Sequence, residues 1–147
     1  MIDAKHLAVH RWQLLDISER RMALEEIENM IAQSQNRPSC DVCFITMKGH
    51  LSGYYHGGSI YLNALLIEQD QPKPAIETVL HEGRHAYQHY ATNHPGFHKN
   101  EAEVVIWRNN LKNYITPEVH LMKYFSQPVE VDARDFAQLQ VNNILLG

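Results

Sequence analysis

The sequence lacks the features that mark several large classes of protein. Lysine and arginine number 13 against 17 aspartates and glutamates, and the formal charge of −4 gives no basic footprint for nucleic acid. No apolar run reaches the roughly eighteen residues of a membrane span. There are no internal repeats, low-complexity segments or long linkers. We therefore expect neither nucleic acid nor a membrane among the partners of this chain.

Cysteine is scarce as well. Cys40 and Cys43 form a single C-x-x-C, and a structural zinc site would need a second pair of thiolates or histidines. A thioredoxin-like redox motif would open a helix after a strand, whereas this pair begins an apolar, β-prone run. We interpret the two residues as reduced cysteines of a strand.

Length and composition are those of one soluble domain. The 147 residues suffice for a sizeable core, and 44% of them are hydrophobic and 20% charged. We expect residues 1–147 to form a single domain. The first six residues, Met-Ile-Asp-Ala-Lys-His, lack the apolar core of a signal peptide. The expected location is therefore cytoplasmic, unless the domain was excised from a larger secreted toxin.

Hydrophobic periodicity and turn signals predict a mostly helical α+β fold. Asp16 and Glu19 form a capping box at the start of the first clear helix, and Gly57-Gly58 suits the turn of a hairpin. Helices are expected over about 17–34, 74–91, 99–114, 116–125 and 127–145, and strands at 42–47 and in a hairpin over 53–63. This small sheet is expected to lie beside the 74–91 helix.

The 17–34 helix is expected to bury one face and expose another. The expected core stripe consists of Met22, Ala23, Ile27, Met30 and Ile31. The expected solvent-exposed charged face consists of Arg20, Glu25, Glu26 and Glu28.

The most informative stretch lies in the 74–91 helix. His81 and His85 are four residues apart and therefore share one helix face, where two imidazoles can reach one zinc ion. Glu82 follows the first histidine and is placed to hold a metal-bound water. This is the H-E-x-x-H arrangement of zinc metallopeptidases. The alternative is a chance match, because the chain contains 10 histidines, but the apolar surroundings argue against a solvated helix.

Two other residues of this helix bear on the site. Gly83 weakens a helix by up to about 1 kcal/mol relative to alanine, and we expect the close approach of another backbone to explain it. His89 continues the histidine stripe but lies about 12 Å along the axis from His81, too far to share its metal.

A catalytic zinc ion needs a third protein ligand. The H-E-x-x-H-x-x-G-x-x-H class is excluded, because Gln88 and Ala91 occupy its glycine and histidine positions. A carboxylate from the last helix is the better answer, and Glu130 lies near its start among apolar residues. The alternative role of Glu130 is a favourable interaction with the N-terminal end of its helix dipole.

At these residues the chain resembles a known family. The matching pattern is His81-Glu82-x-x-His85 followed by Glu130-x-Asp132-Ala133-x-x-Phe136-Ala137. It is similar to the gluzincin-type pattern H-E-x-x-H…E-x-x-A, and most similar to the E-x-E-A-N-x-F-A version of small ImmA/IrrE-like metallopeptidases. Similar compact zincin domains occur among polymorphic toxins. The resemblance covers about residues 53–146 and implies a minimal zincin-like domain.

The resemblance also implies the residues of the site. His81, His85 and Glu130 would be zinc ligands, and Glu82 would be the catalytic base of peptide hydrolysis. Arg134 departs from the family, which usually has Asn or Asp at this position. Asp132 or Asp135 is then expected to supply the contact to a histidine N–H.

The transition-state oxyanion of such a reaction needs a further hydrogen-bond donor. The residues that we consider for this role are Tyr124, His120, Tyr54, Tyr55 and Tyr90. Tyr124 is preferred, because it precedes the Glu130 helix by a short turn.

The functional expectation is a zinc-dependent metalloendopeptidase that acts on a protein or peptide substrate, with a regulatory or immunity protein as a further partner. The alternative is a zinc-binding regulatory or interaction domain that captures a protein without cleaving it. A third reading, a helical scaffold without metal, predicts no bound zinc. Cleavage of a cognate protein that is lost in Glu82→Gln would separate the first two.

Overall fold

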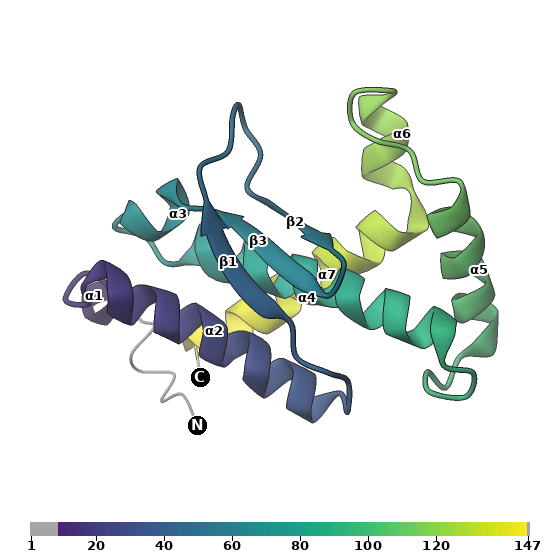
Figure 1. Cartoon of the computed structure of the whole chain (residues 1–147), viewed down its shortest axis with the longest axis horizontal. Helices are drawn as coiled ribbons and strands as arrows, with labels where there is room; N and C mark the ends of the chain where they lie inside the picture. The colour runs from purple at the N-terminus through teal and green to yellow at the C-terminus, as the bar shows by residue number, and fades with distance from the viewer. Residues whose placement is uncertain (1–8, 147) are drawn as a thin grey trace.

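The computed structural model describes residues 9–146 and has the predicted mostly helical α+β fold (Figure 1). The helices are α1 (Val9–Trp12), α2 (Ile17–Ser34), α3 (Leu65–Glu68), α4 (Lys73–Asn93), α5 (Glu101–Lys112), α6 (Leu121–Ser126) and α7 (Pro128–Leu146). The strands are β1 (Asp41–Ile45), β2 (Gly53–His56) and β3 (Ser59–Asn63). Among these residues no helix is both long and apolar enough to cross a membrane.

The three strands form one sheet in the order β1-β3-β2. The predicted hairpin joins β2 to β3 in antiparallel register, with Tyr54 opposite Tyr61. Gly57 and Gly58 both have positive φ angles, of 58° and 85°, as a tight two-residue hairpin turn requires. The parallel pairing of β1 with β3 was not predicted. It leaves β2 as an edge strand on the side of the sheet next to α4.

Helix α4 is the centre of the fold, and α2, α5, α7 and β2 all pack against it (Figure 1). Its buried apolar side chains are Ala75, Ile76, Val79, Leu80, Ala86 and Ala91. Most of them belong to one core that also includes α2, β3 and the second half of α7. A smaller apolar cluster of Ala91, Val104, Trp107 and Val129 joins the end of α4 to α5 and to the start of α7. The two clusters fix α7 against α4 over its whole length.

Helix α2 begins with the predicted capping box. Asp16 Oδ1 accepts a hydrogen bond from the Glu19 amide at 2.8 Å, and Glu19 accepts one from the Asp16 amide at 3.2 Å. The expected faces of the helix were partly wrong. Met22 is 62% exposed, whereas Arg20 and Glu28 are buried. Both charged side chains have buried partners, which compensate the loss of hydration.

The partners of these two residues lie elsewhere in the chain. Arg20 donates to the carbonyl oxygens of Trp12 and Ile67 at 3.1 and 2.8 Å. Glu28 forms a bidentate ion pair with Arg37 at 2.8 and 2.7 Å and accepts a third hydrogen bond from the Cys40 amide. The Glu28 contacts tie α2 to the segment that enters β1, and the Arg20 contacts tie it to α1 and α3. No pattern within α2 reveals them, because all of these partners lie outside the helix.

Two glycines show why α4 lies so close to its neighbours. A Cβ atom on Gly83 would lie 2.9 Å from Glu28 Oε1, so the expectation of a close backbone at Gly83 was wrong. A buried ion pair occupies that space instead. The close backbone occurs at Gly53 in β2, where a Cβ would lie 2.6 Å from the Tyr61 carbonyl oxygen and 2.8 Å from Thr78 Cγ2. Gly53 thus allows β2 to lie against α4.

The segment before α7 differs from its prediction. Helix α6 begins at Leu121 rather than near residue 116, and the His120 side chain caps it by accepting a hydrogen bond from the Lys123 amide at 3.1 Å. None of the side chains of α6 is buried. Helix α6 therefore projects from the body of the domain (Figure 1). Among the described helices and strands, it packs mainly against α7.

Both cysteines are free. Cys43 lies on β1, as expected for a strand cysteine, and Cys40 immediately precedes the strand. Burial and the nearby Glu28 carboxylate raise the pKa of the Cys40 thiol to about 12. Cys40 is therefore an unreactive thiol at neutral pH.

Candidate metal centre

The three side chains expected to hold a metal converge between α4 and α7. His81 Nε2 lies 3.1 Å from Glu130 Oε1, and His85 Nε2 lies 2.8 Å from Glu130 Oε2. The potential ligand atoms of all three residues lie within 4.8 Å of one another. Two imidazole nitrogens and one carboxylate are a donor set that zinc uses in catalytic sites. The residues therefore fit a zinc ion by chemistry and by placement.

Helix packing brings Glu130 to the histidines. Val129, Ala133 and Ala137 are buried where α7 meets its neighbours, which turns Glu130 towards α4 from the first turn of α7. The side chain of Asn110 on α5 accepts a hydrogen bond from the Val129 amide at 2.9 Å and so satisfies a donor in the first turn of α7. Glu130 is only 1% exposed. A buried carboxylate needs partners, and the histidines supply them.

The electrostatics of the three residues are coupled. Burial by itself raises the pKa of Glu130, but hydrogen bonds from His81 and His85 outweigh it and hold that pKa far below its usual range. Burial by itself lowers the pKa of His85, but the hydrogen bond to Glu130 and the charge of Glu82 raise it to about 9. Without a metal, a charged His85–Glu130 pair therefore occupies the centre at neutral pH.

Glu82 lies beside the centre, between the histidines and the edge strand. It is 7% exposed and accepts a hydrogen bond from the backbone amide of Tyr55 in β2. Burial raises its pKa, while the positive charges of His85 and His81 act in the opposite direction. A raised pKa makes a carboxylate a better proton acceptor. Glu82 thus has the position and the environment of a general base.

Two tyrosines contact the proposed third ligand. Tyr114 donates its hydroxyl hydrogen to Glu130 Oε2 at 3.0 Å, and Tyr124 also hydrogen-bonds to Glu130. Burial and the Glu130 charge raise the pKa of both phenols, so both remain protonated donors. Tyr124 was the preferred donor from sequence. Tyr114 was missed, because it follows the end of α5 without any motif and reaches the centre only through the packing of α5 on α7.

The other donors considered from sequence lie in different places. Tyr54 and Tyr55 belong to β2 and line a cavity beside the centre. Tyr90 stacks on His94, with ring centroids 3.8 Å apart, near the end of α4. His120 caps α6.

The second ring nitrogen of His85 has an unexpected partner. His85 Nδ1 lies 2.8 Å from Gln88 Oε1, and Gln88 is fully buried. Asp132 or Asp135 was expected from the sequence to make this contact with the imidazole. Asp132 instead lies one residue further from the ring, beyond Gln88. It accepts hydrogen bonds from Gln88 Nε2 at 2.8 Å and from Arg84 Nε at 2.8 Å. The glutamine side chain, one turn after His85, fills the space that a carboxylate would need.

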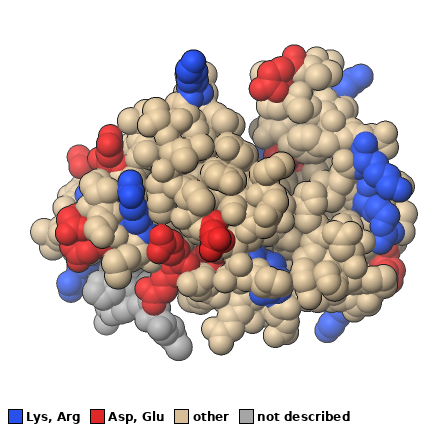
Figure 2. Space-filling view, in the orientation of Figure 1, with Lys and Arg blue, Asp and Glu red and all other residues tan. Residues whose placement is uncertain are grey.

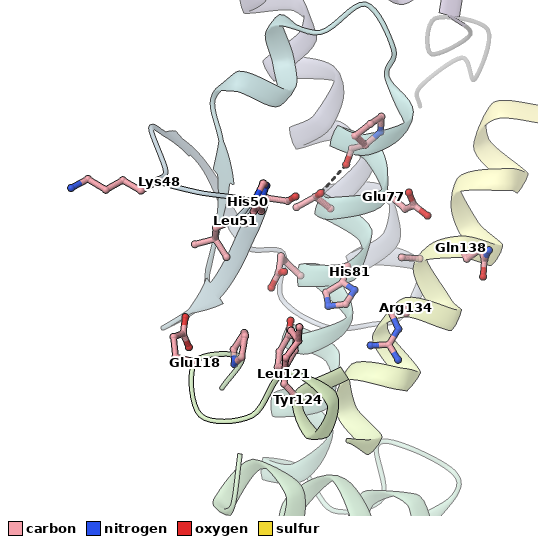
Figure 3. Close-up of a pocket in the computed structure, with 17 residues that line it drawn as sticks. Lys48, His50, Leu51, Glu77, His81, Glu118, Leu121, Tyr124, Arg134 and Gln138 are labelled. Atoms are coloured by element: carbon pink, nitrogen blue, oxygen red, sulfur yellow. Dashed lines mark hydrogen bonds between the residues drawn. The ribbon is translucent and has the colours of Figure 1, made fainter. Parts of the chain in front are cut away.

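Asp135 and Arg134 take no part in this network. Asp135 is exposed on α7. Arg134 occupies the position where the sequence departs from the pattern of the family that it resembles. Its guanidinium carbon lies 3.6 Å from the centroid of the Phe125 ring in α6. Its side chain lines the same cavity as His81 (Figure 3).

The centre lies at the base of a cleft. Figure 2 shows the surface hollowed between the lobe that carries the β1–β2 loop and the lobe that carries α6. One cavity of about 870 Å³ lies on the His81 side, with Lys48, His50 and Leu51 on one wall and Leu121 and Tyr124 on the other (Figure 3). A second cavity of about 420 Å³ lies on the His85 side. Its lining is rich in aromatic rings and includes Tyr54, Tyr55, His89, Tyr114 and Tyr124.

Strand β2 presents a free edge to this cleft. The Ser52 carbonyl oxygen accepts a hydrogen bond from the Asn63 amide at 2.8 Å, so it points towards β3. Backbone groups alternate in direction along an antiparallel edge strand, and those of Gly53 and Tyr55 therefore point away from β3. The hydrogen bond from the Tyr55 amide to Glu82 agrees with this direction. The free edge of β2 thus runs past the candidate base.

The remaining histidines of interest do not join the centre. His89 lines the smaller cavity, and burial lowers its pKa. Among the described residues, only His81, His85 and Glu130 form a cluster of three or more metal-binding side chains. His56 is exposed at the end of β2.

Comparisons of the chain with profiles of protein families, with curated proteins and with solved structures find no match.

Proposed function

We propose that this chain is a zinc-dependent metallopeptidase that hydrolyses a peptide bond in a protein substrate. The observation that carries the proposal is the meeting of His81, His85 and Glu130 at the base of a cleft, with Glu82 beside them. Such a cluster also occurs in structural zinc sites. The open cleft and the adjacent carboxylate favour a catalytic site, because a catalytic zinc keeps one position for water.

In this proposal His81 and His85 bind the ion through Nε2, and Glu130 binds it through its carboxylate. Zinc, when bound, would acidify a water molecule and polarise the scissile carbonyl group. Glu82 accepts the proton of the attacking water. It then transfers that proton to the nitrogen of the leaving amine. The raised pKa of Glu82 supports this double role, because the carboxyl group must both gain and lose the proton.

One tyrosine would stabilise negative charge that develops on the scissile carbonyl oxygen. Tyr124 is the proposed donor, because it borders both cavities and therefore the space above the centre. Tyr114 borders only the smaller cavity and donates to Glu130 at 3.0 Å. We assign it the role of orienting the carboxylate ligand.

The proposed substrate is an extended stretch of polypeptide. The free edge of β2 offers the backbone groups of Gly53 and the carbonyl oxygen of Tyr55 for strand addition, in which main-chain hydrogen bonds supply affinity. A peptide bound there would pass over Glu82 and the three proposed ligands. The two cavities would then receive side chains on the two sides of the scissile bond.

The experiment that tests the proposal uses a peptide library made from a digested proteome as the probe. The zinc-loaded protein is incubated with the library, and new peptide termini are identified by mass spectrometry. Cleavage by the wild-type chain that is absent in Glu82→Gln, with equal zinc content in both proteins, is the expected result. Equal cleavage by both proteins would overturn the proposed role of Glu82.

One observation favours a second function, the capture of a protein without cleavage. Leu121, Met122 and Phe125 on α6 are 64%, 67% and 52% exposed, and no side chain of this helix is buried. An apolar surface of this kind beside a metal centre suits a binding partner, such as a regulatory or immunity protein. Zinc binding without cleavage of the partner that binds there would support this function instead.

A further inference from the structure

We propose that Gln88 is the positioning residue of the metal centre: its side-chain oxygen holds the Nδ1–H of His85 and so leaves Nε2 to face the metal. The proposal rests on the metal centre proposed above and concerns how this chain orients one of its ligands. Gln88 lies one turn after His85 on α4 and is fully buried. Its hydrogen bonds determine which ring nitrogen of His85 carries a hydrogen.

The orientation of the Gln88 amide follows from its neighbours. Its nitrogen lies 2.9 Å from the Val129 carbonyl oxygen and 2.8 Å from Asp132 Oδ2. Both neighbours are acceptors, and an amide nitrogen has two hydrogens to donate. The opposite orientation would place the amide oxygen against two other oxygens in a buried site, which is strongly unfavourable. Gln88 Oε1 must therefore face His85.

The orientation of Gln88 in turn fixes the tautomer of His85. Oε1 is only an acceptor, so the Nδ1 atom 2.8 Å away must carry a hydrogen. In neutral imidazole the lone pair then lies on Nε2, the atom that faces Glu130 at 2.8 Å. A metal requires this lone pair. Because Nδ1 keeps its hydrogen, Nε2 is the ring nitrogen that gives up its hydrogen when a metal binds.

Asp132 and Arg84 hold Gln88 in this orientation. Arg84 donates to both carboxylate oxygens of Asp132, at 2.8 and 3.2 Å, and Asp132 Oδ2 also accepts from Gln88. The guanidinium of Arg84 is packed over the rings of Tyr87, at 4.3 Å, and Phe136, at 4.8 Å. A neutral amide therefore stands between the imidazole and a carboxylate that an arginine already neutralises.

The test compares zinc affinity and the His85 Nδ1 proton in three variants. Gln88→Leu removes the acceptor at similar volume. The double variant Gln88→Glu with Asp132→Asn exchanges carboxylate and amide: it keeps an acceptor for Nδ1–H and a donor from residue 132 to that acceptor, but loses the hydrogen bond to the Val129 carbonyl oxygen. Gln127→Leu is the control: Gln127 is also buried, and its side chain hydrogen-bonds to both backbone groups of Ile115, to Asn110 and to the Tyr124 carbonyl oxygen rather than to a histidine. Zinc affinity is measured by competition with a chromophoric chelator, and the proton by ¹⁵N-edited NMR of the zinc-loaded protein.

We expect Gln88→Leu to weaken zinc binding by about 10-fold or more and to abolish the slowly exchanging Nδ1–H signal. The exchange variant should keep the signal and recover part of the affinity, because only its hydrogen bond to the Val129 carbonyl oxygen is lost. Gln127→Leu should lower the melting temperature without changing the signal. Unchanged affinity and signal in Gln88→Leu would overturn the positioning role alone. A wild-type chain that binds no zinc would overturn the metal centre itself, and the positioning role with it.

Discussion

The carboxylate of Glu28 lies directly behind Gly83, on the face of α4 opposite to the two histidines. A Cβ atom at Gly83 would be 2.9 Å from Glu28 Oε1 and 3.2 Å from Arg37 Nη2. The carboxylate cannot easily move, because two hydrogen bonds from Arg37 and one from the Cys40 amide hold it. The H-E-x-x-H helix is therefore packed from behind by a buried ion pair, and Gly83 is required for that packing.

The first prediction concerns this glycine. Gly83→Ala should destabilise the protein by about 1–3 kcal/mol, although alanine favours a helix by up to about 1 kcal/mol. The added methyl group must displace a buried, fully paired carboxylate. Chemical denaturation of the metal-free protein measures the free energy of unfolding. A more stable Gly83→Ala variant would show that the ion pair yields without cost.

Much of the site could be read from sequence, because it depends on local spacing. His81, Glu82 and His85 lie on one helix, and helical periodicity alone places them on adjacent faces. The capping box of Asp16 and the Gly57-Gly58 turn are likewise local signals. Glu130 was harder to predict, because it lies 45 residues after His85, on another helix. Its apolar neighbours were the clue that α7 packs against α4.

The features that could not be predicted from the sequence depend on contacts between separate segments of the folded chain. Glu28 and Arg20 look like solvent-facing charges on α2, and only their partners in the folded chain explain their burial. Tyr114 reaches Glu130 because α5 packs on α7. Gln88 is the hardest case, because a glutamine one turn after a histidine carries no signal of its own. Such residues become visible only when the donors and acceptors around them are counted.

The second prediction concerns pH in the metal-free protein. The pKa of His85 is raised from 6.5 to about 9, so its stabilising pair with Glu130 is fully present below pH 6.5 and is lost as the pH rises through 9. The loss should be on the order of 3 kcal/mol. Thermal unfolding at a series of pH values, in the presence of a chelator, measures it.

The matching control for this pH dependence is Glu130→Gln. It removes the carboxylate that raises the pKa of His85, and the decline in stability between pH 6.5 and 9 should become much smaller. At acidic pH the sign reverses for Glu130, whose lowered pKa stabilises the fold above about pH 4.5, and this stabilisation is lost as the pH falls. Parallel curves for the two proteins would argue against a charged His85–Glu130 pair.

The third prediction separates the two tyrosines. Tyr124→Phe should lower kcat by about 10²–10³-fold on a peptide that the wild-type chain cleaves, because an oxyanion donor is lost. Tyr114→Phe should instead weaken zinc binding by about 10-fold, since Tyr114 orients the Glu130 carboxylate. Steady-state kinetics and chelator competition measure the two effects. A large loss of kcat in Tyr114→Phe, with unchanged zinc affinity, would exchange the assignments.

The central claim is that His81, His85 and Glu130 together bind one zinc ion. The most direct measurement is elemental analysis of the protein purified without added zinc, beside a Glu130→Ala variant. We predict about one zinc per wild-type chain and clearly less in the variant, because a buried carboxylate ligand is lost. No metal in either protein, even after zinc is supplied, would contradict the account and leave the H-E-x-x-H spacing a coincidence.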